Sequence, residues 1–237
     1  MTLEIEPTVV TIIPARGGSE RVPGKNLKVV NGKPLLAWSI LVSLSAQSVS
    51  RTIVSTDDES IAGVAREYGA EVVDRPSEIS GPHSSSESAL IHTVDQLLRE
   101  TGSDPDIIVF LQATSPLRRK NDVDLAVRRL IDERADSLLS VSTTPGFLWK
   151  IDNDVPTPLT YDYRKRPRSQ ELHNRFVIEN GSMFVLRTQL LRKTGCRLGG
   201  KIIPYFQPPV CAFDIDHAED IAVVDAVMRT GALETKN

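Results

Sequence analysis

The sequence predicts an α/β domain with a mostly parallel sheet and helices on both faces of that sheet. Short runs rich in β-branched residues alternate with segments of helical periodicity, which is typical of successive βαβ units. The run VVTIIP at residues 9–14 is apolar throughout, as expected for a strand that is covered on both faces. The chain has 237 residues, of which 40% are hydrophobic, so one domain of ordinary size can bury a substantial core.

The expected strands are short runs of β-branched and other apolar residues. Residues 9–14 form the first strand, and residues 107–111 have the composition of a buried strand. Beyond position 180 the chain returns to strand-like runs before its last helix. The full set of expected strands is 9–14, 51–55, 70–73, 107–111, 137–141, 182–186, 201–206 and 212–215.

The expected helices have apolar residues three and four positions apart, for example Ile61 and Ala65. Pro34 starts the first helix, because proline is tolerated in a first helical turn. Thr56 or Asp57 is the expected N-cap of the second helix. The full set of expected helices is 34–47, the segment from this cap to residue 68, 84–100, 121–134 and 217–229.

Composition and charge exclude several classes of protein. With 28 Lys+Arg against 31 Asp+Glu, the formal net charge is −3, so we expect no nucleic-acid partner. The two cysteines, Cys196 and Cys211, exclude a disulfide framework and indicate free thiols in a reducing compartment. Residues 1–7 contain two glutamates and no basic residue, unlike a signal peptide, and the longest apolar stretch, 34–46, is too short to span a bilayer. We therefore expect a cytoplasmic protein with no membrane partner.

The strongest chemical signal is the loop PARGGSERVPGKN at residues 14–26, directly after the first expected strand. Ligands of open α/β sheets bind at the carboxyl ends of strands. Gly17 lets the backbone approach an anion closely, while Arg16, Arg21 and Lys25 supply positive charge. The glycine spacing fits neither a Walker A motif nor the dinucleotide fingerprint. A solvated turn would explain the glycine pair alone, but the whole run predicts a polyphosphate site.

A second signal is the pair Asp214 and Asp216, at the end of the expected strand 212–215. On a strand, residues i and i+2 point to the same side, so both carboxylates would face one site. Carboxylates together with phosphates are the usual ligands of protein-bound Mg²⁺. The alternative is that Asp216 caps the following helix and Asp214 is solvated. The polyphosphate loop on the same sheet edge favours the metal.

Two polar segments offer further contacts to a ligand. Gln112 and Ser115 follow the expected strand 107–111 and lie at the same sheet edge, where they can bind a ribose or a sugar. Ser115 can also cap the next helix. The basic run at 164–168 is of a kind that is usually solvated surface, although a carboxylate-bearing ligand would need one such arginine for bidentate binding.

The alternating pattern breaks between residues 145 and 180. Five of the chain's 12 aromatic residues (six Phe, four Tyr and two Trp) fall in this proline-rich segment. Aromatic side chains in a segment too irregular to bury them suggest packing against another surface. A long surface loop is the simpler alternative, but we favour a dimerisation arm. The catalytic domain then comprises residues 1–144 and 181–237.

Several motifs together resemble the CMP-sialic acid synthetases, also called N-acylneuraminate cytidylyltransferases. The run IIPARGGSERVPGKN, followed by GKPLLAWSI, resembles the opening of that family. Further matches follow in order across nearly the whole chain: VSTDDESIAGVAREYGAEV, DRPSEIS, LQATSPLR, ENGSMFV and DIDHAEDI. The resemblance implies a Rossmann-like nucleotidyltransferase fold with a small dimerisation arm, and a homodimer.

The same resemblance implies an activity. Such enzymes transfer CMP from CTP to the anomeric hydroxyl of a nine-carbon α-keto acid sugar, namely sialic acid or a related nonulosonic acid, and release pyrophosphate. Mg²⁺ is the implied cofactor. Within the enzyme class the alternative is transfer to the eight-carbon Kdo. From a different class, the alternative is a catalytically silent nucleotide-binding subunit.

The resemblance also implies roles for individual residues. Arg75 and one of the serines at 84–86 would recognise cytosine, and Arg168 would meet the sugar carboxylate in the neighbouring subunit. The expected catalytic residues are Arg16, Lys25, Asp214 and Asp216, the two aspartates as ligands of Mg²⁺. The expected nucleotide-binding residues are Ala15, Arg16, Gly17, Ser19, Lys25, Asn26, Arg75, Ser86 and Gln112. The expected sugar-binding residues are Gln112, Ser115, Arg168, Tyr205 and Phe206.

Overall fold

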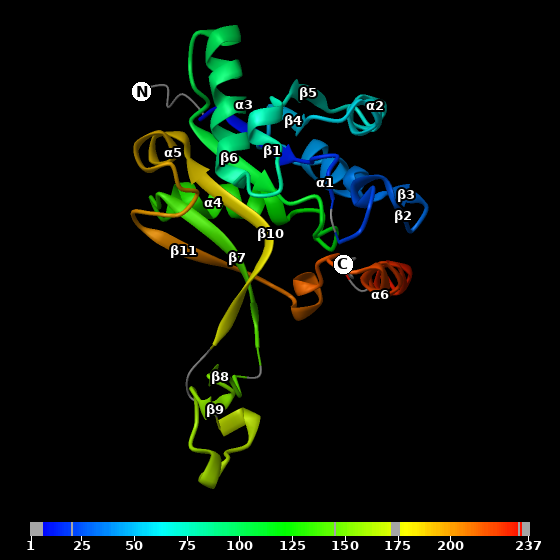
Figure 1. Cartoon of the computed structure of the whole chain (residues 1–237). Helices are drawn as coiled ribbons and strands as arrows, with labels where there is room; N and C mark the ends of the chain where they lie inside the picture. Colours follow the sequence, from blue (N-terminus) through cyan, green and yellow to red (C-terminus); the bar gives the residue numbers. More distant parts are fainter. Residues whose placement is uncertain (1–6, 20, 145, 172–175, 232, 234–237) are drawn as a thin grey trace.

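A seven-stranded, mostly parallel sheet forms the centre of the molecule (Figure 1). The computed structural model describes residues 7–19, 21–144, 146–171, 176–231 and 233. The strand order is β11-β7-β10-β6-β1-β4-β5. Only β10 is antiparallel to its neighbours β6 and β7, and the other adjacent strands are parallel. The strands are β1 Val9–Pro14, β4 Arg51–Thr56, β5 Glu71–Asp74, β6 Ile107–Leu111, β7 Ser137–Thr143, β10 Val177–Arg187 and β11 Ile202–Gln207.

Helices cover both faces of this sheet, as predicted. On one face α3 contributes Leu90 and Val94 to a cluster with Val10 and Ile12 of β1. On the other face α1, α2 and α4 pack on the strand residues of opposite parity, such as Ile13, because successive strand side chains alternate between the faces. The helices are α1 Leu35–Leu44, α2 Glu59–Glu67, α3 Ser86–Thr101, α4 Asp122–Asp132, α5 Thr188–Thr194 and α6 Ala218–Arg229.

Three local predictions are wrong. Residues 212–215 do not form a strand, because the chain turns through the 3-10 helix Pro209–Ala212 and continues irregularly; proline has no N–H to donate to a strand ladder. The cap of α2 is Asp58, whose carboxylate accepts from the Ile61 N–H at 3.0 Å, and not Thr56 or Asp57. Helix α5 was not predicted at all.

The segment that breaks the alternating pattern projects from the main body (Figure 1). It hangs from extended ends of β7 and β10: β10 starts at Val177, earlier than predicted, and Val177 pairs with Thr143. Beyond these ends lie the hairpin strands β8 Trp149–Asp152 and β9 Val155–Pro158 and two short 3-10 helices, Tyr163–Lys165 and Ser169–Glu171. The remaining short elements are the hairpin strands β2 Val29–Val30 and β3 Lys33–Pro34 and the 3-10 helices Lys25–Leu27 and Ser77–Ile79.

The arm partly buries its own aromatic side chains. Phe147 and Tyr161 meet edge to face at 5.0 Å between ring centroids, and Trp149 donates its indole N–H to the Tyr161 hydroxyl at 2.8 Å. Other apolar side chains of the arm stay in solvent: Ile151 is 69% exposed and Leu159 is 60% exposed. The arm therefore has a small aromatic core and an uncovered apolar surface.

Candidate active site

A cleft of about 460 Å³ opens at the carboxyl ends of β1 and β6, which is where an open α/β sheet binds its ligands. Its walls come from the 14–26 loop after β1, the 75–86 segment before α3, and residues 110–114 at the end of β6. Most of the predicted nucleotide-binding residues line it. They are Ala15, Arg16, Ser19, Lys25, Asn26, Arg75, Ser86 and Gln112.

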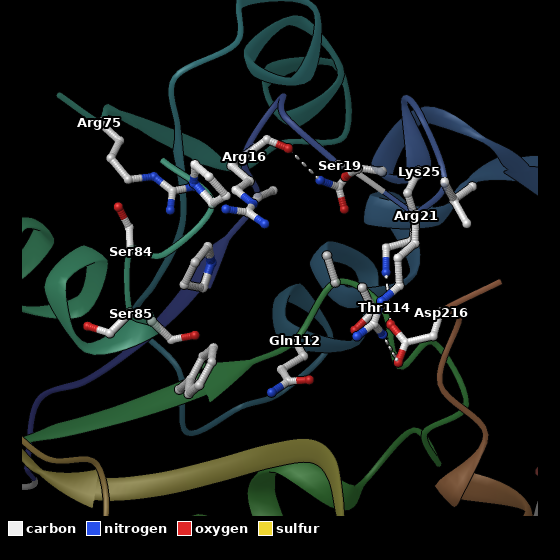
Figure 2. A pocket seen from close by; sticks show the side chains of 18 residues that line it. Arg16, Ser19, Arg21, Lys25, Arg75, Ser84, Ser85, Gln112, Thr114 and Asp216 are labelled. Carbon is white, nitrogen blue, oxygen red and sulfur yellow. Dashed lines mark hydrogen bonds and ion pairs between the residues drawn. The ribbon is translucent and has the colours of Figure 1, made fainter. Parts of the chain in front are cut away.

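The cleft has two chemically different ends (Figure 2). Arg75, Ser84 and Ser85 lie at one end, and Lys25 and Asp216 lie at the other. Gln112 and Arg16 lie between these groups. One end thus presents hydroxyls and a single buried guanidinium, and the other presents a concentration of paired charges.

At the charged end, two segments that are about 190 residues apart in sequence meet. The Lys25 ammonium donates to the Ile215 carbonyl at 2.5 Å and lies 3.5 Å from an Asp216 carboxylate oxygen. Arg21 lies 2.9 Å from the other oxygen of Asp216. The Lys25 side chain is only 12% exposed, so its charge acts in a poorly solvated position, where electrostatic interactions are stronger.

The glycine loop is fixed by the turn after β4. The Gly17 N–H donates to Asp57 at 3.0 Å, and Asn26 donates its side-chain amide to the Arg16 carbonyl at 3.1 Å. A Cβ on Gly17 would lie 2.6 Å from a carboxylate oxygen of Asp58, so glycine is required for this close approach. Gly17 is not among the residues that line the cleft, and its N–H is used to anchor the loop to Asp57.

At the other end of the cleft, Arg75 is fixed by burial and by a hydrogen bond to the backbone. It is 7% exposed, and one terminal nitrogen donates to the Ser55 carbonyl at 3.0 Å. Burial lowers the pKa of Arg75; the charge of Asp57 opposes this shift and that of Arg16 adds to it. Of the three serines that line this end, Ser85 is the N-cap of α3 and accepts from the Ser88 N–H at 3.1 Å. Ser84 and Ser86 are therefore the serines without a capping task in this helix.

No role was predicted for Arg118 from the sequence, but its hydrogen bonds support the cleft. Its guanidinium donates to the carbonyls of Gln112 and Ser182 at 2.7 and 2.6 Å and to the Ser39 hydroxyl at 2.8 Å. Burial lowers the pKa of Arg118 to about 10, so it stays charged at neutral pH. Gly181, at φ +67, leaves room for the Gln112 side chain, since a Cβ there would lie 3.0 Å from its oxygen. The LQATSPLR motif is the sequence signal that contains Arg118.

Similarity to known proteins identifies the family of this chain. A family model described as Cytidylyltransferase matches residues 10–157, more than half of the chain. The chain belongs to the cytidylyltransferase family. It is 34% identical over 228 residues to N-acylneuraminate cytidylyltransferase A of Danio rerio, covering 94% of this chain and 51% of that protein. It is 35% identical over 150 residues to CMP-N,N'-diacetyllegionaminic acid synthase of Legionella pneumophila (strain Philadelphia 1), covering 61% of this chain and 63% of that protein.

These similarities confirm the resemblance stated from the motifs. The chain spans about half the length of the Danio rerio relative. Among solved structures, the chain is similar to CMP:2-keto-3-deoxy-manno-octonic acid synthetase complexed with CTP. The TM-score is 0.68 at 21% identity, covering 94% of this chain and 99% of that one. This likeness confirms the nucleotidyltransferase fold.

The chain brings together only part of the predicted metal and sugar sites. Asp216 lines the cleft, but Asp214 and Ser115 do not. Asp214 instead accepts from the Ser115 hydroxyl at 3.3 Å and from the Ile215 N–H at 3.0 Å. Ser115 is 1% exposed and does not cap the next helix, whose N-cap position is Asn121. Ser115 thus supports Asp214, one step behind the cleft.

The other predicted sugar contacts lie outside the cleft of this chain. Tyr205 is buried in β11 and donates its hydroxyl to the fully buried carboxylate of Asp122 at 2.9 Å, so its polar atom is used within the fold. Phe206 is 45% exposed on the same strand. Arg168 directly precedes the 3-10 helix Ser169–Glu171 of the arm and donates its backbone N–H to Glu171 at 3.0 Å. A single chain does not bring these three residues to the cleft.

The described residues contain no group of three or more His, Cys, Asp or Glu side chains placed to hold a metal ion. Asp216 at the charged end, with Asp214 one step behind it, still suits Mg²⁺, because this ion usually takes only one or two protein carboxylates and completes its shell with substrate phosphates and water. In the same part of the chain, no helix has the length and apolar character needed to cross a bilayer.

Proposed function

We propose that this cytidylyltransferase transfers CMP from CTP to the anomeric hydroxyl of a nine-carbon α-keto acid sugar of the nonulosonic acid class. The observation that carries the proposal is the single cleft that joins a cationic phosphate loop to an end built from Arg75 and serines. The names of the relatives, which include sialic and legionaminic acid enzymes, support this class of sugar. Which nonulosonic acid is used depends on contacts that the cleft of one chain does not contain.

The mechanism follows from the placement of charge. The sugar hydroxyl attacks the α-phosphorus of CTP, the bond from that phosphorus to the α,β-bridging oxygen breaks, and pyrophosphate departs with the bonding electrons. Arg16 and Lys25 stabilise the negative charge that grows on this leaving group. In such transfers catalysis consists mainly of positioning and electrostatic stabilisation. Asp216 is the carboxylate that lines the cleft among the described residues, so one of its two oxygens is the proposed acceptor of the hydroxyl proton.

Asp216 and Asp214 are the proposed ligands of Mg²⁺, together with the phosphates of CTP. When bound, the ion would neutralise phosphate charge and orient the triphosphate. In the present arrangement the Asp216 carboxylate is already paired with Arg21 and Lys25. These cations would turn to the phosphates as the nucleotide enters.

The arm is the proposed dimer contact. Its exposed apolar side chains, such as Ile151 and Leu159, need a cover, and a second copy of the chain would supply one. The partner's arm is also the route by which an Arg168 would reach a cleft, since the arm of the same chain projects away from the main body (Figure 1). The cytoplasm is the proposed location, in keeping with two free cysteines.

A pyrophosphate-release assay with CTP and Mg²⁺ tests the proposal. Sialic, legionaminic and pseudaminic acids and Kdo are the acceptors to compare. Turnover with at least one nine-carbon acid, and a lower kcat/KM with Kdo, is the expected outcome. Turnover with Kdo alone would replace the proposed acceptor. CTP binding without turnover of any acceptor would favour a silent nucleotide-binding subunit.

A further inference from the structure

Arg197, in the loop between α5 and β11, packs on two aromatic rings, one of which lines the cleft. Its guanidinium stacks over the Phe184 ring at 4.7 Å and reaches the Phe110 ring at 5.5 Å. These two rings stack on each other at 5.5 Å with an interplanar angle of 17°, and they face each other across β6 and β10. Both rings are almost fully buried. A cation thus sits behind two aromatic rings in the core.

The ring stack reaches the cleft through Phe110, which lines it. Arg197 also lies 3.5 Å from the carboxylate of Glu87, which is in the first turn of α3. The residues just before Glu87 in sequence are Ser84, Ser85 and Ser86, which line the same end of the cleft. Arg197 therefore contacts both features that shape this end of the cleft: the Phe110–Phe184 pair and the first turn of α3.

Arginine is suited to this position for a physical reason. Its planar guanidinium can lie flat on a ring and still direct an N–H toward a carboxylate. The side chains of Arg197 and Glu87 are only 26% and 18% exposed, so solvent screens their interaction less than it would at the surface. A lysine would keep the charge but could not stack on the ring.

The neighbouring Arg192 provides a natural contrast. It also ties α5 to α3, through ion pairs with Asp95 and with Asp104 just beyond the helix. Neither partner lines the cleft. Arg192 therefore joins α5 to α3 and the residues just beyond it through partners that belong neither to the aromatic pair nor to the serine segment.

We propose that Arg197 is a positioning residue that holds Phe110 and the first turn of α3 in place, and so sets the affinity of the cleft for the cytosine end of the nucleotide. This rests on the proposed function, in which the Arg75 and serine end takes the base. The contacts of Arg197 are with Phe110, Phe184 and Glu87, and none of these residues belongs to the phosphate loop. Arg197 should therefore affect ligands that carry the base and spare ligands that are only phosphate.

The test is calorimetric titration in Mg²⁺ without sugar, with CTP, CMP and inorganic tripolyphosphate as separate ligands. Arg197→Ala is expected to raise the Kd of CTP and CMP by about tenfold and to leave the Kd of tripolyphosphate unchanged. Arg197→Lys should fall between wild type and alanine. In turnover, KM for CTP should rise with kcat at saturation retained. Arg192→Ala is the matched control, with all three Kd values near wild type.

Two results would overturn the inference: equal effects of Arg197→Ala and Arg192→Ala on CTP, or an equal loss of affinity for CTP and tripolyphosphate in Arg197→Ala. Should the alanine variant not fold, Glu87→Gln tests the same contact in a milder form, with a rise of about threefold in the Kd of CTP expected. An unchanged Kd in Glu87→Gln, together with an unchanged Kd in Arg197→Lys, would also overturn it. Failure of the wild-type protein to bind CTP would instead contradict the proposed function.

Discussion

The two ends of the cleft are held in place by different forces. At the charged end, the Asp216 carboxylate pairs with both Lys25 and Arg21 and so links two distant segments. At the other end, burial and a hydrogen bond to the Ser55 carbonyl fix Arg75, and Ser85 is fixed as the N-cap of α3. Charge develops on the leaving pyrophosphate during the reaction, whereas the base is unchanged by it. The charged end should therefore govern kcat, and the other end should govern KM, because uniform binding does not accelerate the chemical step.

Lys25→Ala should give the largest effect. Removing this poorly solvated ammonium takes away stabilisation of the departing pyrophosphate, and kcat should fall by about 100-fold or more. Pyrophosphate release at saturating CTP is the measurement. Lys28→Ala is the control, because Lys28 is an exposed lysine directly after the 3-10 helix Lys25–Leu27 and does not line the cleft. Near-wild-type turnover of Lys25→Ala would remove the distinction between the two ends.

The aspartate pair comes next. Asp216→Ala and Asp214→Ala should each lower kcat by about 100-fold and raise the Mg²⁺ concentration needed for half-maximal activity. A Mg²⁺ titration of the initial rate distinguishes this from a general loss of structure. Glu219→Gln, at an exposed acid in the first turn of α6, should leave the titration unchanged. An unaltered Mg²⁺ requirement in Asp214→Ala would confine the metal site to Asp216.

Arg75→Lys tests the other end with a smaller expected effect. The variant keeps the charge but loses the planar donor that contacts the Ser55 carbonyl, so KM for CTP should rise about tenfold with little change in kcat. Steady-state kinetics with varied CTP measures both constants. A fall in kcat as large as that of Lys25→Ala would show that kcat and KM are not governed by separate ends of the cleft.

The sequence predicted best what depends on local pattern. Strands 9–14 and 107–111 match β1 and β6 residue for residue, because a short apolar run with abrupt ends has little freedom in its bounds. The expected strand 212–215 is wrong, because two prolines just before it redirect the chain. Asp216 still reaches the charged end, whereas Asp214 stays one step behind the cleft.

The supporting contacts of the site could not be predicted from the sequence. Arg118 was visible in a motif, but its partner Ser182 lies 64 residues away, and no local pattern encodes such a pairing. Tyr205 was expected at the sugar, yet its hydroxyl is bound to Asp122, 83 residues away in sequence. Motifs identified the residues that face the cleft, whereas the residues behind them depend on tertiary contacts.

Substitutions of the three serines at 84–86 should have the smallest effects. They test which serine stabilises α3 and which one binds the nucleotide. Ser85 caps α3, so Ser85→Ala should lower the free energy of unfolding by about 1 kcal/mol. Ser84→Ala and Ser86→Ala should leave stability unchanged, and one of them should raise the Kd of CTP by about fivefold through a lost hydrogen bond. Thermal unfolding and calorimetric titration of the three variants separate the roles. If Ser85→Ala weakens CTP binding most and unfolds like wild type, the cap itself is the contact to the base.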